Sequence, residues 1–240
     1  MSLKIGVPSK GRLMEKTFDW FGARGVGMRL AGASREYSGA VEGVAGAELV
    51  LLSAGEIPRE LAAGRIHLGV TGSDLVREKL PDWEEQVVEL APLGFGFADL
   101  IIAVPCAWID VDTLDDLDAA AAAFRRQHGF RLRIATKYHR LTRDFLRGAG
   151  VADYQLVDSQ GATEGTVRNL TAEAISDITS TGETLRANHL KILTDGLIHR
   201  SEAMLFAARS ADWNPAARTA LAGLCARLDL GMPGGLGAGG

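Results

Sequence analysis

Cysteine and grouped metal ligands are scarce in this 240-residue sequence. Its two cysteines, Cys106 and Cys225, stand alone without a CxxC pair, and none of the five histidines has a partner at metal-ligand spacing. A zinc site and a disulfide framework are therefore not expected, whereas two ordinary thiols in a reducing compartment are. We expect the histidines to lie at the surface or in loops.

Long apolar runs and an excess of positive charge are also missing. Nowhere do about 18 apolar residues follow one another, so we expect a cytoplasmic protein with no membrane span. The formal charge of -4, with acids and bases interspersed, gives no extended basic surface for nucleic acid. Any anionic ligand must therefore be bound by a local site.

Short apolar runs alternate with helix-like stretches along most of the chain. This alternation is typical of βαβ units and a mostly parallel sheet, so we expect an α/β fold. Strands are predicted at 3–8, 47–53, 66–72, 99–105, 131–137, 154–159 and 173–179. Helices are predicted at 14–23, 56–65, 73–80, 112–128 and 141–150.

The order of these segments favours two α/β lobes with a ligand cleft between them. Residues 191–209 read as a strand that continues into further structure, so the chain is expected to enter the second lobe and then return to the first. We predict lobe I from residues 1–93 plus 186–230 and lobe II from 94–185. The five glycines in PGGLGAGG predict a disordered tail at 231–240.

The segment EAISDITSTGETLRAN, residues 173–188, joins a predicted strand to a hydroxyl-rich turn. Glu173 and Asp177 lie on one face of that strand because side chains alternate. Free amides, hydroxyls and a glycine before a helix suit a phosphate, and an acid nearby suits sugar hydroxyls. The alternative is an ordinary connection in which Thr184 serves only as an N-cap. The turn consists of Thr179, Ser180, Thr181, Gly182, Glu183 and Thr184.

A second turn, in PSKGRL, follows the first predicted strand. Lys10, Gly11 and Arg12 put two cations beside a glycine at the start of a helix. Such a turn can bind pyrophosphate or triphosphate, although a solvated turn of the same composition would serve no ligand. The aspartates at 110–118 are explained by the helix start that they surround.

Asp177 to Thr184, as D-x-x-x-T-G-x-T, resembles the phosphoribosyl pyrophosphate loop of phosphoribosyltransferases. Residues 161–188, which include Glu164, resemble the ATP phosphoribosyltransferase family as one continuous run. Further resemblance is carried by IGVPSKGRL (5–13), SRE (34–36), EIPRELAAGRIHLGVTGSDLV (56–76) and LRIATKYHRLTRDFL (132–146). Together these motifs cover nearly all of residues 3 to 209.

The resemblance implies a fold similar to type II periplasmic binding proteins and the first reaction of histidine biosynthesis. In that reaction N1 of the ATP adenine attacks C1 of the ribose of phosphoribosyl pyrophosphate, and pyrophosphate leaves. Mg²⁺ would be bound mainly through the substrate phosphates, so no protein metal ligands are expected. Charge placement, with no covalent nucleophile, would carry the catalysis.

The same resemblance implies roles for particular residues. Residues 180–184 would bind the 5′-phosphate, and Asp177 with Glu173 the ribose hydroxyls. Lys10 and Arg35 are the expected catalytic cations, with Arg12 beside them. Contacts to ATP or pyrophosphate are expected from Gly11, Arg12, Gly72 and Glu164.

Only about 30 residues follow position 209, too few for a regulatory domain, so the sequence resembles the short form of the family. A hetero-oligomer with a regulatory subunit similar to histidyl-tRNA synthetase is then expected. The sequence departs from the family at five positions, of which Asp99 and Ser53 lose a positive charge at expected ligand contacts. Leu170 replaces glycine, Ala98 and Asp99 replace cysteine and arginine, Ser53 replaces a base, and Glu56 replaces aspartate.

Two other functions fit parts of these patterns. A solute-binding or ligand-sensing protein could use the same two-lobed fold, because fold does not fix function. Another phosphoribosyltransferase would share the phosphate loop but not PSKGRL or TGSDLV. An assay of product formation separates these alternatives from the family's reaction.

Overall fold

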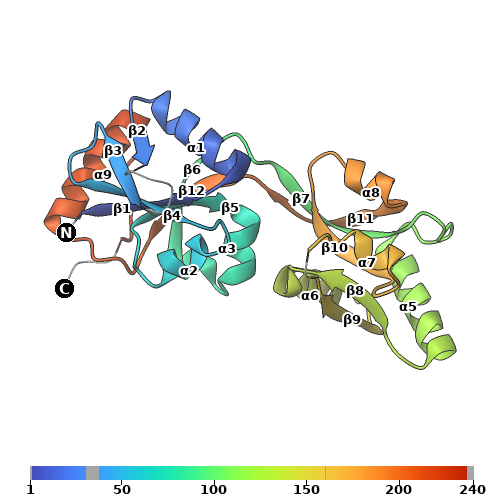
Figure 1. Cartoon of the computed structure of the whole chain (residues 1–240). Coiled ribbons are helices and arrows are strands. Elements are labelled where there is room, and N and C mark those ends of the chain that lie inside the picture. Colours follow the sequence, from blue (N-terminus) through green and yellow to red (C-terminus); the bar gives the residue numbers. More distant parts are fainter. Residues whose placement is uncertain (1, 31–37, 160, 237–240) are drawn as a thin grey trace. The chain divides into compact units, whose positions relative to one another are not determined.

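The structure, a computed structural model, describes residues 2–30, 38–159 and 161–236. The chain divides into two compact α/β units, each with apolar core residues of its own. Unit 1 comprises residues 1–96 and 202–240, and unit 2 comprises residues 97–201 (Figure 1). The two α/β units confirm the predicted fold class.

Unit 1 is built on one sheet with the strand order β2-β3-β4-β1-β5-β12-β6. Its strands are β1 (Leu3–Pro8), β2 (Gly27–Leu30), β3 (Ser38–Glu42), β4 (Ala47–Leu52), β5 (Leu68–Gly72), β6 (Val87–Pro92) and β12 (Ala203–Ala208). Its helices are α1 (Gly11–Gly22), α2 (Ile57–Ala62), α3 (Ser73–Lys79), α4 (Trp83–Gln86) and α9 (Pro215–Leu228). β4, β1 and β5 run parallel, so their carboxyl ends meet at one edge.

The core of unit 1 explains why β1 lies at the middle of the sheet. Leu3, Ile5 and Val7 are fully buried, as expected of a short apolar run in a parallel sheet covered on both faces. Helix α9 packs its apolar stripe, including Leu221 and Leu224, into the same core. No sequence pattern had predicted α9 or the antiparallel strands β2, β3, β6 and β12 as separate elements.

Unit 2 is built on a second sheet with the strand order β11-β7-β10-β8-β9. Its strands are β7 (Ala98–Pro105), β8 (Leu132–Thr136), β9 (Tyr154–Asp158), β10 (Ala174–Thr179) and β11 (Leu190–Ser201). Its helices are α5 (Leu114–His128), α6 (His139–Gly148), α7 (Gly165–Arg168) and α8 (Glu183–Ala187). β9, β8 and β10 run parallel, and β7 and β11 are antiparallel to their neighbours.

The two faces of this sheet bury different helices because successive side chains alternate. Ile102 and Val104 of β7 belong to the cluster that includes α5 and α6. Ile101 and Ala103 belong to the opposite cluster, which includes Leu185 of α8. In β10, Ile175 shares the α8 cluster, so Asp177, two residues later, lies on the face that α8 covers.

The boundary between the units differs from the prediction at its second crossing. Residues 186–201 belong to unit 2, whereas the prediction assigned 186–230 to lobe I. The physical reason is strand pairing, because β11 lies antiparallel to β7 from Leu190 to Ser201. The chain returns to unit 1 only at Glu202, just before β12 begins.

The predicted disordered tail also differs from the structure over its described part. Residues 231–236 are described, and residues 237–240 lie outside the described residues. Leu236 packs against the core of unit 1, and the carbonyl of Gly235 accepts a hydrogen bond from Arg209. None of the helices in the described part of the chain has the length and apolarity to cross a membrane.

Histidine and cysteine positions correct one expectation. His67 is buried, not in a surface loop. Its Nδ1 accepts from the amide of Lys4 at 3.1 Å, so Nε2 holds the proton and donates to the Asp212 carbonyl at 3.1 Å. Burial lowers the pKa of His67. Cys106 and Cys225 are both free thiols.

Candidate active site

The edge of unit 2 where β8, β9 and β10 end contains a polar pocket. Parallel strands bring their carboxyl ends to one edge, which is where ligands bind in open α/β sheets. The pocket has a volume of about 220 Å³. Its lining is Glu164, Asp177, Ile178, Thr179, Ser180, Thr181, Thr184 and Leu185. The structure therefore brings the predicted phosphate loop and Glu164 together.

The turn after β10, residues 179–184, is called the phosphate turn below. Its own hydroxyl groups hold its shape. Gly182 has a φ of +71°, and its amide donates to Thr179 Oγ1 at 3.0 Å. Thr181 Oγ1 accepts from the amide of Glu183 at 3.3 Å. Ser180 Oγ donates to the carbonyl of Phe97 at 2.9 Å, which fastens the turn to the start of unit 2.

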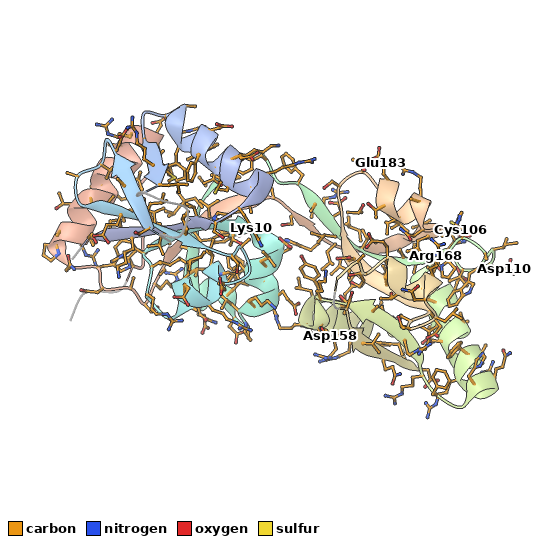
Figure 2. All side chains as sticks on the ribbon, viewed as in Figure 1. Lys10, Cys106, Asp110, Asp158, Arg168 and Glu183 are labelled. Carbon is orange, nitrogen blue, oxygen red and sulfur yellow. The ribbon has the colours of Figure 1, made fainter. Side chains whose placement is uncertain are left out.

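Thr184 does not cap the helix, so the N-cap alternative is wrong. Helix α8 begins at Glu183, and its N-cap position is Gly182, which has no side chain. Thr184, the second residue of α8, lines the pocket. Glu183 projects from the first turn of α8 (Figure 2) and does not line the pocket.

The two carboxylates that line the pocket come from different elements. Asp177 Oδ1 accepts from the amide of Ile178 at 2.9 Å, and Glu164 occupies the N-cap position of α7. The lining contains no lysine or arginine among the described residues. An anion bound there would be met by hydroxyl and amide groups and not by a paired cation.

Glu173 does not join this pocket, contrary to the prediction. It lies before the first residue of β10, at the end of the strand opposite to the phosphate turn. Its carboxylate forms an ion pair with Arg133 at 2.6 Å and also accepts from the Arg133 amide at 2.8 Å. This hydrogen bonding raises the pKa of Arg133. Both carboxylate oxygens are used within the fold.

Unit 1 has a second polar edge, at the carboxyl ends of β1, β4 and β5. Lys10 holds the N-cap position of α1 (Figure 2), and no side chain caps this helix. Gly11 has a φ of +75°, and Lys10 and Arg12 are exposed. Gly72 holds the N-cap position of α3 at the end of the neighbouring strand β5. The two turns therefore lie at the same edge of one sheet.

Ser53, where a base stands in the family, binds an acid of its own turn. Its amide and hydroxyl donate to the Glu56 carboxylate at 3.0 and 2.7 Å, and these bonds lower the pKa of Glu56. Thr71 at the end of β5 donates to the carbonyl of Ala54 at 2.8 Å. The turn after β4 is therefore fixed by hydroxyl groups.

The other departures have local structural settings. Asp99 lies between Thr179 and Arg200 in the sheet of unit 2, and Ala98 lies opposite Ser201. Leu170 has a φ of +56° and is 81% exposed, so it adopts the backbone conformation for which glycine is best suited. The predicted catalytic residue Arg35 lies outside the described residues.

Two further hollows are not candidate active sites, and the described residues form no metal site. Two larger hollows of unit 2, of about 430 and 420 Å³, lie along β9 and beside α5, and they contain no predicted site residue. Across residues 2–30, 38–159 and 161–236, no three or more His, Cys, Asp and Glu residues gather as a metal site would need.

Comparison with known proteins decides the family. The family model of ATP phosphoribosyltransferase matches residues 53–229. The chain belongs to the ATP phosphoribosyltransferase family. It is 80% identical over 233 residues to an ATP phosphoribosyltransferase of Cereibacter sphaeroides, covering 97% of this chain and 98% of that protein. An ATP phosphoribosyltransferase of Bradyrhizobium sp. is 51% identical over 216 residues, which are 90% of this chain and 66% of that protein.

Solved structures agree on the fold. An ATP phosphoribosyl transferase (HisG:HisZ) complex from Thermotoga maritima matches with a TM-score of 0.70 and 21% identity, over 95% of this chain and 96% of that one. A putative L-cystine ABC transporter from Listeria monocytogenes matches with a TM-score of 0.56 and 10% identity, over 95% and 91% of the two chains. The predicted similarity to binding-protein folds is confirmed.

Membership of the ATP phosphoribosyltransferase family confirms the enzyme class predicted from the motifs. The chain is a phosphoribosyl-transferring enzyme of the first step of histidine biosynthesis. Arg186, to which the motifs gave no role, donates from its guanidinium to the carbonyl of Thr181 in the phosphate turn at 3.1 Å. Its position four residues after Gly182, on the same side of a short helix, was the available signal.

Proposed function

We propose that unit 2 binds phosphoribosyl pyrophosphate through the pocket at the end of β10 and that this binding positions C1 of the ribose for attack by N1 of the ATP adenine. The pocket lined by the phosphate turn, Asp177 and Glu164 carries the proposal. In the reaction the N1–C1 bond forms as the bond from C1 to pyrophosphate breaks.

The 5′-phosphate would be bound by the turn itself. Ser180, Thr181 and Thr184 line the pocket with hydroxyl groups, and Gly182, with a φ of +71°, lets the chain turn between Thr181 and the start of α8. Neutral donors bind a phosphate while leaving its charge available to Mg²⁺ and to distant cations. The phosphate fixes one end of the substrate, so the reacting carbon can be oriented before attack.

Asp177 would accept hydrogen bonds from the ribose hydroxyls. One of its carboxylate oxygens accepts from the Ile178 amide, which holds the carboxylate at the pocket wall and leaves the second oxygen for the substrate. A negative charge beside the sugar also stabilises the positive charge that develops on an oxocarbenium-like ribose. We assign the ribose to Asp177 alone, because Glu173 is bonded to Arg133.

The exposed turn at Lys10, Gly11 and Arg12 would bind the phosphates of ATP or pyrophosphate in unit 1. Helix α1 spans 12 residues and begins with no side-chain cap, so its first amides are available to an anion. Gly72 at the neighbouring strand end would allow a nucleotide to approach the backbone. Arg35 would add a further cation, and Lys10 and Arg35 would stabilise the leaving pyrophosphate.

When bound through the substrate phosphates, Mg²⁺ would supply positive charge for the leaving pyrophosphate. Glu164, the second carboxylate of the pocket, fits a cation that keeps most of its water and binds chiefly to phosphate oxygens, since Asp177 is assigned to the ribose. The residues of this chain would orient the ribose and exclude water from C1.

We further propose that the enzyme is cytoplasmic and works with a regulatory subunit similar to histidyl-tRNA synthetase. Two observations support this partner. The chain from Thermotoga maritima with the same fold comes from a HisG:HisZ complex, and this chain covers 98% of the Cereibacter sphaeroides relative. That this chain is a short form of the family remains a prediction.

An absorbance assay tests the proposal directly. Purified chain is incubated with ATP, phosphoribosyl pyrophosphate and Mg²⁺, with and without the proposed regulatory subunit, and phosphoribosyl-ATP is measured. We expect product that requires both substrates. Folded protein that forms no product in either condition would overturn the proposal, and binding without turnover would favour a ligand-binding role.

A further inference from the structure

In the phosphate turn, the peptide group between Thr181 and Gly182 forms two hydrogen bonds to side chains, one through its C=O and one through its N–H. The carbonyl of Thr181 accepts from Arg186 Nη2 at 3.1 Å, and the amide of Gly182 donates to Thr179 Oγ1 at 3.0 Å. This peptide is trans, so its C=O and N–H groups point in opposite directions. The two side chains therefore hold one peptide plane from opposite sides.

The guanidinium also packs against the backbone of the turn. A Cβ atom added at Gly182 would lie 3.0 Å from Arg186 Nη1, and Gly182 has a φ of +71°. Arg186 is exposed and does not line the pocket, whereas Thr181, whose carbonyl it binds, does. Its contacts are with the back of the turn and not with the pocket.

Thr179 and Arg186 are not needed for the core. Thr179 is half-buried near the end of β10, and Arg186 lies in the last turn of α8 with its side chain extended back to the turn. The described contacts of both side chains are with backbone groups of the turn. A role in shaping the turn accounts for both residues with one arrangement.

We propose that Thr179 and Arg186 are positioning residues that fix the Thr181–Gly182 peptide so that the turn is already shaped for a phosphate before substrate binds. The inference rests on the proposed function of this pocket. If the peptide were free to rotate, its carbonyl oxygen could turn toward the bound phosphate and repel it. Holding the C=O on the Arg186 side keeps this acceptor away from the anion, leaves the hydroxyl groups of Thr181 and Thr184 to meet it, and removes an ordering cost from binding.

Three variants of the full chain separate this role from a direct charge effect. Thr179→Val removes the acceptor at nearly constant shape, Arg186→Met removes the donors but keeps an apolar stem, and the double variant removes both. Each is assayed with the regulatory subunit present for KM and kcat, and phosphoribosyl pyrophosphate with Mg²⁺ is titrated by calorimetry. Arg168→Met, an exposed arginine on α7 (Figure 2), is the matched control.

We expect each single variant to raise the KM for phosphoribosyl pyrophosphate by up to about tenfold, the effect of one lost hydrogen bond, with kcat and the KM for ATP little changed. The double variant should be well short of a 100-fold loss, because both side chains hold the same peptide. Arg186→Lys should recover most of the affinity, since one donor reaches the carbonyl. Arg168→Met should match the wild type.

Hydrogen exchange of the Gly182 amide gives a readout that does not depend on catalysis. In the free enzyme we expect faster exchange in Thr179→Val and also in Arg186→Met, although the second variant leaves the amide's own acceptor in place. Unchanged exchange in Arg186→Met would overturn the inference.

The kinetic results can overturn it in two other ways. If the losses in the single variants multiply fully in the double variant, Arg186 acts independently of the peptide and the inference is wrong. The inference is also wrong if the wild type binds phosphoribosyl pyrophosphate and both single variants bind it with the same affinity. A folded wild type that does not bind this substrate would overturn the proposed function itself, and the same titration shows which has failed.

Discussion

The polar edges of the two units are built from the same backbone arrangement but opposite chemistry. In each, parallel strands end together and a glycine with positive φ stands beside the start of a helix, at Gly11 in unit 1 and Gly182 in unit 2. Unit 1 places the exposed cations Lys10 and Arg12 there, whereas the pocket of unit 2 is lined by hydroxyls and two acids. The difference suits a substrate with one sugar phosphate to position and several phosphate charges to balance.

The largest effect is expected when Asp177, in the pocket of unit 2, is neutralised. Asp177→Asn should raise the KM for phosphoribosyl pyrophosphate by about 10- to 100-fold, because a hydrogen bond to a charged group is lost, and should leave the KM for ATP nearly unchanged. Thr184→Ala should shift the same constant in the same direction. Equal losses for both substrates, measured by initial rates, would mean that the substrates are assigned to the wrong units.

Glu173→Gln tests whether Glu173, just before β10, and Asp177, within β10, have separate roles. The side chains of Glu173 and Arg133 are 14% and 27% exposed, so breaking their pair should lower the free energy of unfolding by about 1–3 kcal/mol. Urea titration measures this loss. The KM for phosphoribosyl pyrophosphate should stay at the wild-type value, and a rise similar to that of Asp177→Asn would restore Glu173 to the substrate site.

Lys10→Met tests the cationic edge of unit 1. Removing one exposed charge should lower kcat/KM about tenfold, an effect that should shrink as salt is added. Lys16→Met, on the same helix α1 and away from the turn, is the control. Equal effects of the two substitutions would show that general charge, not the turn, is responsible.

The stability of unit 1 should depend on pH through His67. Burial lowers the pKa of His67 in the folded protein, so below about pH 6.5 the unfolded chain binds the proton first and the free energy of unfolding falls as pH falls. The slope from this group cannot exceed about 1.4 kcal/mol per pH unit. Urea titrations between pH 5 and 8 should show this contribution in the wild type but not in His67→Gln; an identical slope in both would exclude His67 as its source.

The smallest change expected is a gain of stability. Leu170→Gly should raise the free energy of unfolding by about 0.5–1 kcal/mol, because Leu170 has a φ of +56° and its exposed side chain contributes little burial. Thermal unfolding measures the gain. A loss of stability would show that the side chain makes contacts that outweigh the backbone strain.

Strong local patterns predicted most of the sheet edges that form the site. The apolar run of β1 and the alternation in β10 gave the strand positions and the face on which Asp177 lies. The pair between Arg133 and Glu173 joins residues 40 positions apart, so no local pattern could show that Glu173 was already bonded. The reassignment of β11 to unit 2 likewise depends on pairing with β7.

The weaker elements were missed for a related reason. β2 and β3 contain glycine and charged residues, and they become strands because each pairs antiparallel with a neighbour. Arg186 was read only as part of a family signature, since its bond to Thr181 depends on how the turn folds back. Contacts made in three dimensions decide these features, and the order of residues alone does not.

The split of unit 1 around unit 2 has a consequence for how the chain folds as it is made. β12 lies between β5 and β6 inside the sheet of unit 1, yet it follows all of unit 2 in the sequence. A ribosome therefore releases a complete unit 2 while the sheet of unit 1 still has an open gap. We expect unit 2 to fold first and unit 1 to close only when its last 39 residues, 202–240, have emerged, since such long-range pairing is slow.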